Sequence, residues 1–274
     1  MRIRLVGLCM VVCLPVWAGC SRSSSLTGPY MATDRQENGM VVILPGIEGK
    51  SFLNERLREG LSKAGTPYAQ PIWQWGSRIP IVKLAMNEMD VQGNRASGQE
   101  LAIWIARYQD QYPGRPVYLV GHSGGGGIAV FAAEALARMS GKRKLQGMIL
   151  LSPSVSANYD LTAAINACEK GVVSFYNEGD VGVLWLGTTL AGNVDGGHGA
   201  SAGRVGFRPP GVHDADARRR AYHKLFQVET SEGVGGILSN HTSDTQISFV
   251  RQYVAPWILA SAWPPLTNEV ALNQ

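Results

Sequence analysis

Short apolar runs alternate with longer stretches of helical spacing along most of the chain. The runs are rich in Val, Ile and Leu, and the longer stretches repeat apolar residues every three or four positions. This alternation is typical of a parallel β-sheet that is covered by helices on both faces. The pattern predicts strands over residues 40–44, 68–75, 117–121, 147–151, 172–176 and 224–229. It predicts helices over residues 51–64, 97–112, 125–139, 160–168, 181–190 and 242–260.

These elements are expected to form one α/β domain over residues 40–262, followed by a C-terminal tail at residues 263–274. Residues 191–211 are rich in glycine and follow neither the helical nor the strand period. A loop of this length inside a compact domain usually has a function. Our hypothesis is that residues 191–211 form a small lid over the functional site of the protein.

The first residues have the pattern of an export signal. Arg2 and Arg4 precede an apolar stretch at residues 5–16, which is short for a membrane span. Small residues then precede Cys20, a pattern that resembles the lipobox of bacterial lipoproteins. Trp17 stands where a lipobox usually has an aliphatic residue, so an ordinary secretory signal stays open as the alternative.

The lipobox resemblance implies a signal peptide over residues 1–19 and a lipid on Cys20. Residues 20–39 would then form a flexible polar tether. We therefore expect an exported protein of the bacterial cell envelope that is anchored to a membrane through Cys20.

The net charge and the cysteine content limit two further kinds of interaction, nucleic-acid binding and disulfide bonding. The formal net charge of the chain is +4, and the loss of Arg2 and Arg4 lowers it to +2, which is too small to indicate nucleic-acid binding. Of the four cysteines, Cys9, Cys13 and Cys20 lie in the first twenty residues. Cys168 then has no disulfide partner, and we expect it to be a buried, inert thiol.

The strongest chemical signal is the sequence Gly-His-Ser-Gly-Gly at residues 121–125. It has the form G-x-S-x-G and stands between a predicted strand and a predicted helix. This arrangement is typical of a nucleophile elbow, whose strained turn exposes the serine hydroxyl above a sheet. The sequence therefore predicts that Ser123 is the nucleophile, with Gly121 and Gly125 keeping the turn free of side chains.

An activated serine needs a base and an acid that orients the base. Asp180 follows the predicted strand at residues 172–176, and His241 stands just before the predicted closing helix, so the chain order Ser…Asp…His is met. Asp160 and Glu178 are the rival acids.

The developing oxyanion needs two N–H donors. The backbone N–H of Gly124 is the first expected donor, and the N–H of Ile47, in the loop after the first strand, is the second. Asp195, His198, His213 and Asp214 are metal-ligating residue types, but their spacing matches no ligand signature. No metal or organic cofactor is expected.

Together these motifs resemble the α/β-hydrolase superfamily over residues 40–260. The resemblance lies in the Leu-Pro-Gly-Ile-Glu-Gly loop, the elbow, Asn-Glu-Gly-Asp and the late Asn-His. It implies an α/β-hydrolase fold with a mostly parallel central sheet, helices on both faces and no large cap domain. It also implies a Ser123–His241–Asp180 triad. Pro45 stands where many members have His, which leaves the backbone donor in place.

The resemblance favours a serine hydrolase that cleaves a carboxylic ester or related acyl bond of a small molecule or lipid. Trp73 and Trp75 are expected in the core, with an acyl pocket as the alternative place for them. A non-catalytic envelope binding protein on the same scaffold is one alternative function, and the complete set of triad candidates argues against it. An acyltransferase that uses the same serine is the other alternative.

Overall fold

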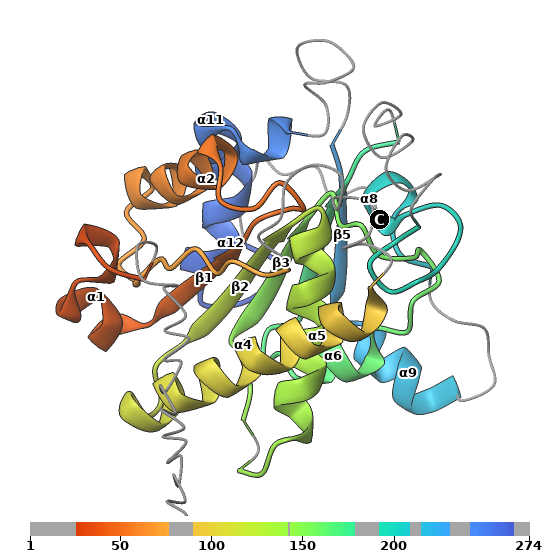
Figure 1. Ribbon diagram of the computed structural model, residues 1–274, viewed down its shortest axis with the longest axis horizontal. Helices are drawn as coiled ribbons and strands as arrows, with labels where there is room; N and C mark the ends of the chain where they lie inside the picture. The colour runs from red at the N-terminus through yellow and green to blue at the C-terminus, as the bar shows by residue number, and fades with distance from the viewer. Residues whose placement is uncertain are drawn as a thin grey trace, which may run out of the picture.

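The computed structural model describes residues 26–76, 90–141, 143–178, 192–208, 215–230 and 242–265. Its centre is a five-stranded sheet in the order β1-β2-β3-β4-β5, and every neighbouring pair of strands is parallel. The strands are β1 (Met40–Leu44), β2 (Val117–His122), β3 (Gly147–Leu151), β4 (Val172–Tyr176) and β5 (Leu225–Glu229) (Figure 1). The parallel sheet predicted from the apolar runs is therefore confirmed.

Helices cover both faces of this sheet (Figure 1). One face carries α4 (Val91–Gln111), α5 (Gly124–Arg138), α6 (Thr162–Asn166) and α9 (Ala215–Tyr222). The other carries α2 (Phe52–Lys63), α11 (Ile247–Phe249), a π-helical turn η4 (Val250–Val254) and α12 (Ala255–Leu259). The remaining short helices are η1 (Pro29–Met31), α1 (Thr33–Asn38), α8 (Ala202–Val205) and η3 (Ser243–Thr245).

The strands supply apolar side chains to both layers, because successive residues of a strand point to opposite faces. Val42 and Leu119 pack in the α4–α5 core, whereas Ile43 and Val120 pack in the α2–α12 core. All four are fully buried. Full burial of each such side chain contributes about 1.5–3 kcal/mol relative to exposure, which is why these runs read as continuous apolar segments.

The strand predicted at residues 68–75 is wrong. That stretch is an extended segment beside β1 that forms only isolated bridges, Met40 with Ala69 and Ile43 with Ile72. Its backbone still hydrogen-bonds to β1, with Ile43 N–H donating to Pro71 O at 2.9 Å. Pro71 has no N–H of its own, so a continuous ladder cannot form there.

Two helices differ from their predicted bounds. Helix α4 begins at Val91 rather than residue 97, because Asp90 caps it with its carboxylate accepting from Gly93 N–H at 2.9 Å. The closing helix is broken near its start, since Gln246 has extended backbone angles (φ −68°, ψ 144°) between η3 and α11. The helix predicted at residues 181–190 lies outside the described residues.

Part of the stretch expected as a flexible tether packs on the domain. Helix α1 lies in it, and Arg35 donates to the carbonyl oxygens of Thr66 (3.2 Å) and Tyr68 (3.0 Å). Tyr108 also donates to Gln36 O at 2.6 Å. These contacts fix α1 against the edge of the sheet, so the tether expected from sequence does not extend over α1. The expected signal peptide and Cys20 lie outside the described residues.

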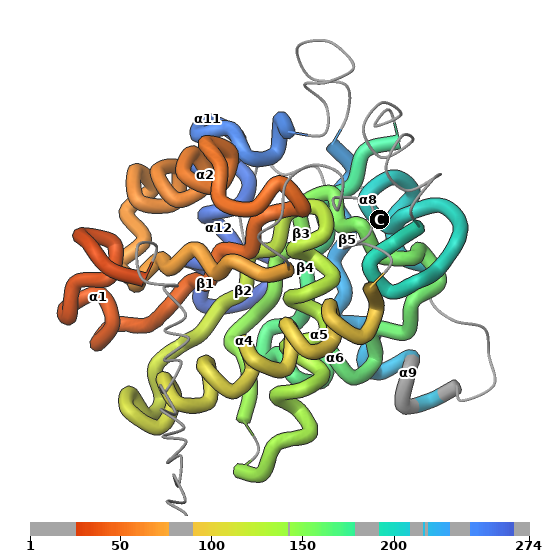
Figure 2. Tube along the Cα trace, viewed as in Figure 1, coloured from red at the N-terminus to blue at the C-terminus, as the bar shows by residue number. Residues whose placement is uncertain are grey.

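The glycine-rich stretch is anchored over residues 192–208 (Figure 2). Val194 is fully buried there, and its N–H donates to Ser154 O at 3.2 Å. Gly203 lies in the short helix α8, which the sequence pattern did not predict, and its N–H donates to Pro153 O at 2.9 Å. A lid role for this stretch stays a prediction.

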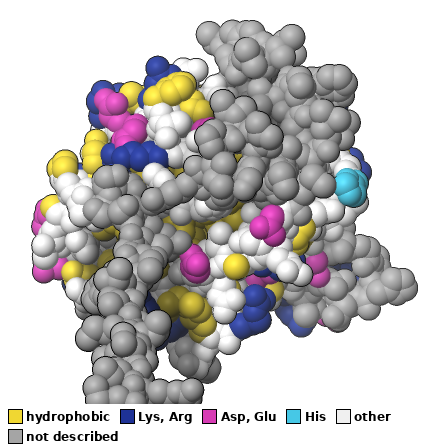
Figure 3. All heavy atoms as spheres, in the orientation of Figure 1, with side chains coloured by type: hydrophobic (Ala, Val, Ile, Leu, Met, Phe, Trp, Pro, Cys, Tyr) yellow, Lys and Arg dark blue, Asp and Glu magenta, His cyan; other side chains and the backbone are white. Residues whose placement is uncertain are grey.

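The face drawn in Figure 3 intersperses acidic and basic side chains among the described residues. In the part of the chain that the structure describes, no helix is both long enough and apolar enough to cross a membrane.

Cys168 is fully buried, and burial raises the pKa of its thiol to about 12. Only the thiolate reacts with disulfide reagents, so at pH 8 the native thiol stays protonated and inaccessible. We expect no reaction of an aromatic disulfide reagent with the native domain lacking residues 1–20. One thiol should react after unfolding in denaturant, and rapid reaction of the native protein would contradict this packing.

Candidate active site

Ser123 stands at the junction of β2 and α5 in a strained backbone conformation. Its φ of 52° and ψ of −124° lie in a region that residues with a side chain rarely adopt, at a cost of about 1–3 kcal/mol. Neighbouring backbone holds this conformation: Ser123 N–H donates to Leu151 O at 2.9 Å, and Ser154 N–H donates to Ser123 O at 3.0 Å. The predicted elbow geometry is therefore present.

Gly121 and Gly125 allow three backbone segments to meet at this turn. A Cβ atom at Gly121 would lie 2.6 Å from Gly125 O. A Cβ atom at Gly125 would lie 2.4 Å from the carbonyl oxygens of Leu44 and Pro45. Strand β2, helix α5 and the loop after β1 are thus in direct contact, which any side chain at these positions would prevent.

The loop over residues 45–49 follows β1 and lies against Ser123. A Cβ atom at Gly46 would be 3.2 Å from Ser123 Cβ, and one at Gly124 would be 3.1 Å from Ile47 Cγ2. The structure therefore brings together Ser123, Ile47 and Gly124, as the sequence predicts. Gly124 is the first residue of α5, and the first amides of a helix have no partner within the helix, so they are free to bind an anion.

Two side chains brace this loop from opposite ends. Trp75 Nε1–H donates to Pro45 O at 2.7 Å. Asn54, in the first turn of α2 and 3% exposed, donates to Gly49 O at 3.2 Å and to the Glu48 carboxylate at 3.3 Å. The Ile47 peptide is thus held between two fixed points, which favours preorganised oxyanion binding.

Trp73 and Trp75 lie in different surroundings. Trp73 is buried in the core against Trp104, with ring centroids 5.1 Å apart, as expected. Trp75 instead lines the elbow, since a Cβ atom at Gly124 would lie 3.0 Å from its ring. Trp75 is half-buried and packs at the edge of the core beside Ser123, so the predicted core position is confirmed for it only in part.

Asp180 and His241 lie outside the described residues, so the structure does not place their side chains. The last described residue before Asp180 is Glu178, two positions past β4. The first described residue after His241 is Thr242. The rival acid Asp160 accepts hydrogen bonds from the N–H and the hydroxyl of Thr162. Its carboxylate therefore caps the turn that opens α6.

Sequence reasoning missed a buried polar group beside the elbow. Asp244 accepts a hydrogen bond from Ser152 Oγ at 2.8 Å, and its other carboxylate oxygen lies 3.7 Å from His122 Nε2. All three side chains are buried. The only sequence signal is an acidic residue three positions after His241, which reads equally well as a helix cap.

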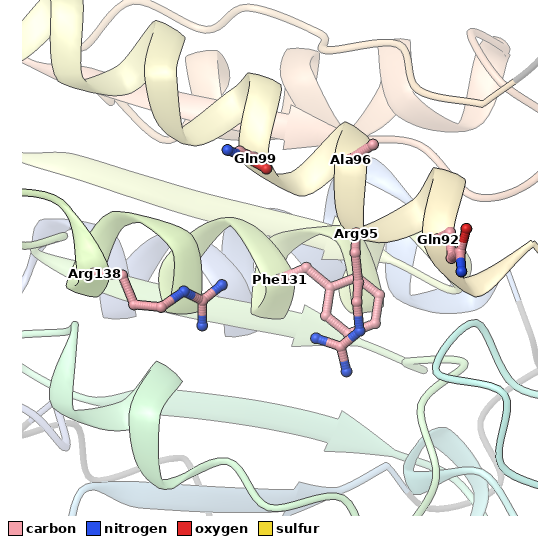
Figure 4. Close-up of a pocket in the computed structure, with 6 residues that line it drawn as sticks. All are labelled: Gln92, Arg95, Ala96, Gln99, Phe131 and Arg138. Atoms are coloured by element: carbon pink, nitrogen blue, oxygen red, sulfur yellow. The ribbon is translucent and has the colours of Figure 1, made fainter.

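A separate hollow of about 370 Å³ lies between α4 and α5 (Figure 4). Arg95 stacks over the Phe131 ring there at 4.5 Å and pairs with Glu134 at 3.5 Å. The residues that line it are Gln92, Arg95, Ala96, Gln99, Phe131 and Arg138. None of the predicted site residues is among them. Among the residues that the structure describes, no cluster of metal-ligating side chains occurs.

Crowding of the oxyanion loop has a testable consequence. A methyl group at Gly124 would press on Trp75 and Ile47, whose nearest atoms would lie 3.0 and 3.1 Å from it. Loss of one oxyanion donor costs about 10²–10³ in kcat, and we expect Gly124→Ala to fall in this range with little change in Tm. Gly124→Ala/Ile47→Ala should recover part of the loss. An unchanged kcat in well-folded Gly124→Ala would show that these groups do not bind the oxyanion.

The parallel sheet and the serine elbow together form an α/β-hydrolase fold. The family model Hydrolase_4, described as serine aminopeptidase, S33, matches residues 87–192, which include β2, the elbow and α5. These findings together support a hydrolase built on this fold. No curated protein matches the chain.

Two solved structures are among those similar to the chain. The structure of esterase PE8 is 15% identical with a TM-score of 0.43, and the alignment covers 78% of this chain and 92% of the other. A lipase-esterase related protein from Clostridium acetobutylicum ATCC 824 is 10% identical with a TM-score of 0.40, over 79% and 93% of the two chains. These similarities are weak, so the assignment rests on the sheet, the elbow and the family match.

Proposed function

We propose that the protein is a serine hydrolase that cleaves a carboxylic ester through an acyl-enzyme on Ser123. The observation that carries this proposal is the strained elbow pressed against a braced loop at Ile47. A buried serine at φ 52° destabilises the fold, and this cost is offset by function if the hydroxyl is a nucleophile beside oxyanion donors.

In the proposed reaction, the His241 imidazole takes the proton of Ser123 Oγ while this oxygen attacks the ester carbonyl. The N–H groups of Ile47 and Gly124 stabilise the oxyanion of the tetrahedral intermediate. The intermediate collapses as the alcohol leaves with the proton from His241. Water then attacks the acyl-enzyme with His241 again as base, the acid is released, and Ser123 regains its proton. Asp180 orients the imidazole throughout.

Chain topology supports these two assignments. All five strands are parallel, so the carboxyl ends of β2, β4 and β5 lie along one edge of the sheet. Ser123 follows β2, Asp180 lies four residues beyond the end of β4, and His241 comes after β5.

The matched family description favours a second candidate substrate, a peptide amide. A panel of nitrophenyl esters with short and long acyl chains, run beside aminoacyl anilides, separates the two. We expect ester turnover that is lost in Ser123→Ala. Turnover of the anilides alone would replace the ester by an amide, and a transfer product formed with an added alcohol would indicate an acyltransferase. No turnover of any member by the folded protein would favour the binding-protein alternative.

A further inference from the structure

We infer that Asp244 is a positioning residue that anchors the segment carrying the base to the elbow carrying the nucleophile. The inference rests on the proposed function, because it assigns Asp244 a role through His241. Asp244 lies in η3, and its side chain is 3% exposed. Asp244 has an acidic side chain, yet it lies in the protein interior. An ionised carboxylate is stable there only if hydrogen bonds or an opposite charge compensate for the lost water.

Those contacts lead directly to the elbow. Ser152 Oγ–H donates to Asp244 Oδ2 at 2.8 Å, and His122 Nε2 lies 3.7 Å from Asp244 Oδ1. His122 immediately precedes the nucleophile in the chain. The carboxylate thus lies between the last residue of β2 and the residue that follows β3.

Ser152 is itself a fixed point. Its backbone has a φ of 43°, a second buried non-glycine residue in the left-handed region. Its N–H donates to Phe175 O at 3.0 Å, and the preceding carbonyl, Leu151 O, accepts the N–H of Ser123. A side chain that is hydrogen-bonded to Ser152 therefore has a fixed position relative to Ser123. Strained backbone of this kind persists where the surrounding structure determines the conformation.

The other end of the anchor is the chain next to His241. The turn at residues 242–245 is closed by hydrogen bonds from Thr245 to Thr242 O, from the N–H at 3.2 Å and from Oγ1 at 2.7 Å. Thr242 directly follows His241 in the sequence, and we expect this turn to set the direction of the chain next to the base. Asp244 is three positions after His241 in the sequence, and three residues of chain span at most about 11 Å.

This geometry gives Asp244 a catalytic consequence without contact with substrate. A shift of about 1 Å in a reacting group can cost about 10²-fold in rate. We therefore expect Asp244→Asn and Ser152→Ala to lower kcat per active site by about 10–100-fold, with KM unchanged. The hydroxyl of Ser174, a serine buried on β4, has no hydrogen-bond partner among the described residues, so Ser174→Ala is the matched control.

The experiment titrates active sites with a fluorophosphonate and measures ester turnover per titrated site for each variant. A positioning role predicts a full count of sites, slower labelling and a lower kcat per site. A purely structural role would lower the count of sites and the Tm but leave kcat per site unchanged, which would overturn the inference. If Asp244→Asn does not fold, Ser152→Ala decides the question in the same way, because it keeps the carboxylate.

The double variant Asp244→Asn/His241→Ala tests whether Asp244 acts through His241. If Asp244 acts through His241, Asp244→Asn should add no further loss of labelling rate in the His241→Ala background, since groups that act as a unit are not additive. A full additional loss would overturn the inference. An unlabelled wild type, or a His241→Ala variant as fast as wild type, would instead refute the proposed function and its base.

Discussion

Ser123→Ala is expected to abolish turnover, with kcat lowered by about 10⁴–10⁶-fold, because removal of a serine nucleophile disables base and acid together. The fold should persist, since Ser123 makes its described hydrogen bonds through its backbone rather than its hydroxyl. Ester turnover and thermal unfolding of the purified domain measure both properties. Full activity in the alanine variant would show that the chemistry lies elsewhere.

The same position allows an independent test of strain. Alanine keeps the Cβ atom that makes φ 52° costly, whereas glycine adopts positive φ freely. Ser123→Gly should therefore be more stable than Ser123→Ala by about 1 kcal/mol. Chemical denaturation gives this difference directly. A glycine variant that is less stable than the alanine variant would argue against a strained elbow.

His241→Ala is expected to lower kcat by about 10⁴–10⁶-fold, and Asp180→Asn by about 10⁴-fold, because the base and its orienting acid work with the nucleophile as one unit. His223→Ala is the matched control, because His223 is an exposed histidine with no proposed role. Turnover and labelling rates of the three variants measure the effects.

Asp160 is the alternative to Asp180 as the acid of the triad. Asp160→Asn should leave kcat close to wild type, since the Asp160 carboxylate accepts hydrogen bonds from Thr162 at the start of α6. If Asp160→Asn is inactive and Asp180→Asn is active, the acid is Asp160 and the serine hydrolase survives with a different triad. If neither variant loses activity, the triad itself is wrong.

The sheet could be predicted from the sequence because each strand is an uninterrupted apolar run buried on both faces. The runs at β1, β3 and β4 have the same bounds in the structure as in the prediction. The stretch at residues 68–75 has the same composition, but it forms only isolated bridges to β1 at the sheet edge, and Pro71 interrupts its ladder. The closing helix breaks at Gln246, where no proline or glycine marks the site.

The elbow at Ser123 and the loop over residues 45–49 beside it could be predicted because their signals are local in sequence. The residues that support them could not, because their roles arise from contacts between distant parts of the chain. Ser152 and Asp244 are 92 residues apart, and Trp75 and Pro45 are 30 residues apart. Serine, tryptophan and aspartate at such positions have ordinary local explanations as turn, core and cap residues. Only the packed fold distinguishes them.

Reaction of the domain lacking residues 1–20 with a fluorophosphonate, followed by mass-spectrometric mapping of the adduct, tests the central claim most directly. An activated serine hydroxyl forms this covalent adduct, whereas an ordinary serine does not. The account predicts one adduct, on Ser123, and no labelling of Ser123→Ala under the same conditions. A folded wild-type domain that takes up no probe, or takes it up equally in Ser123→Ala, would contradict it.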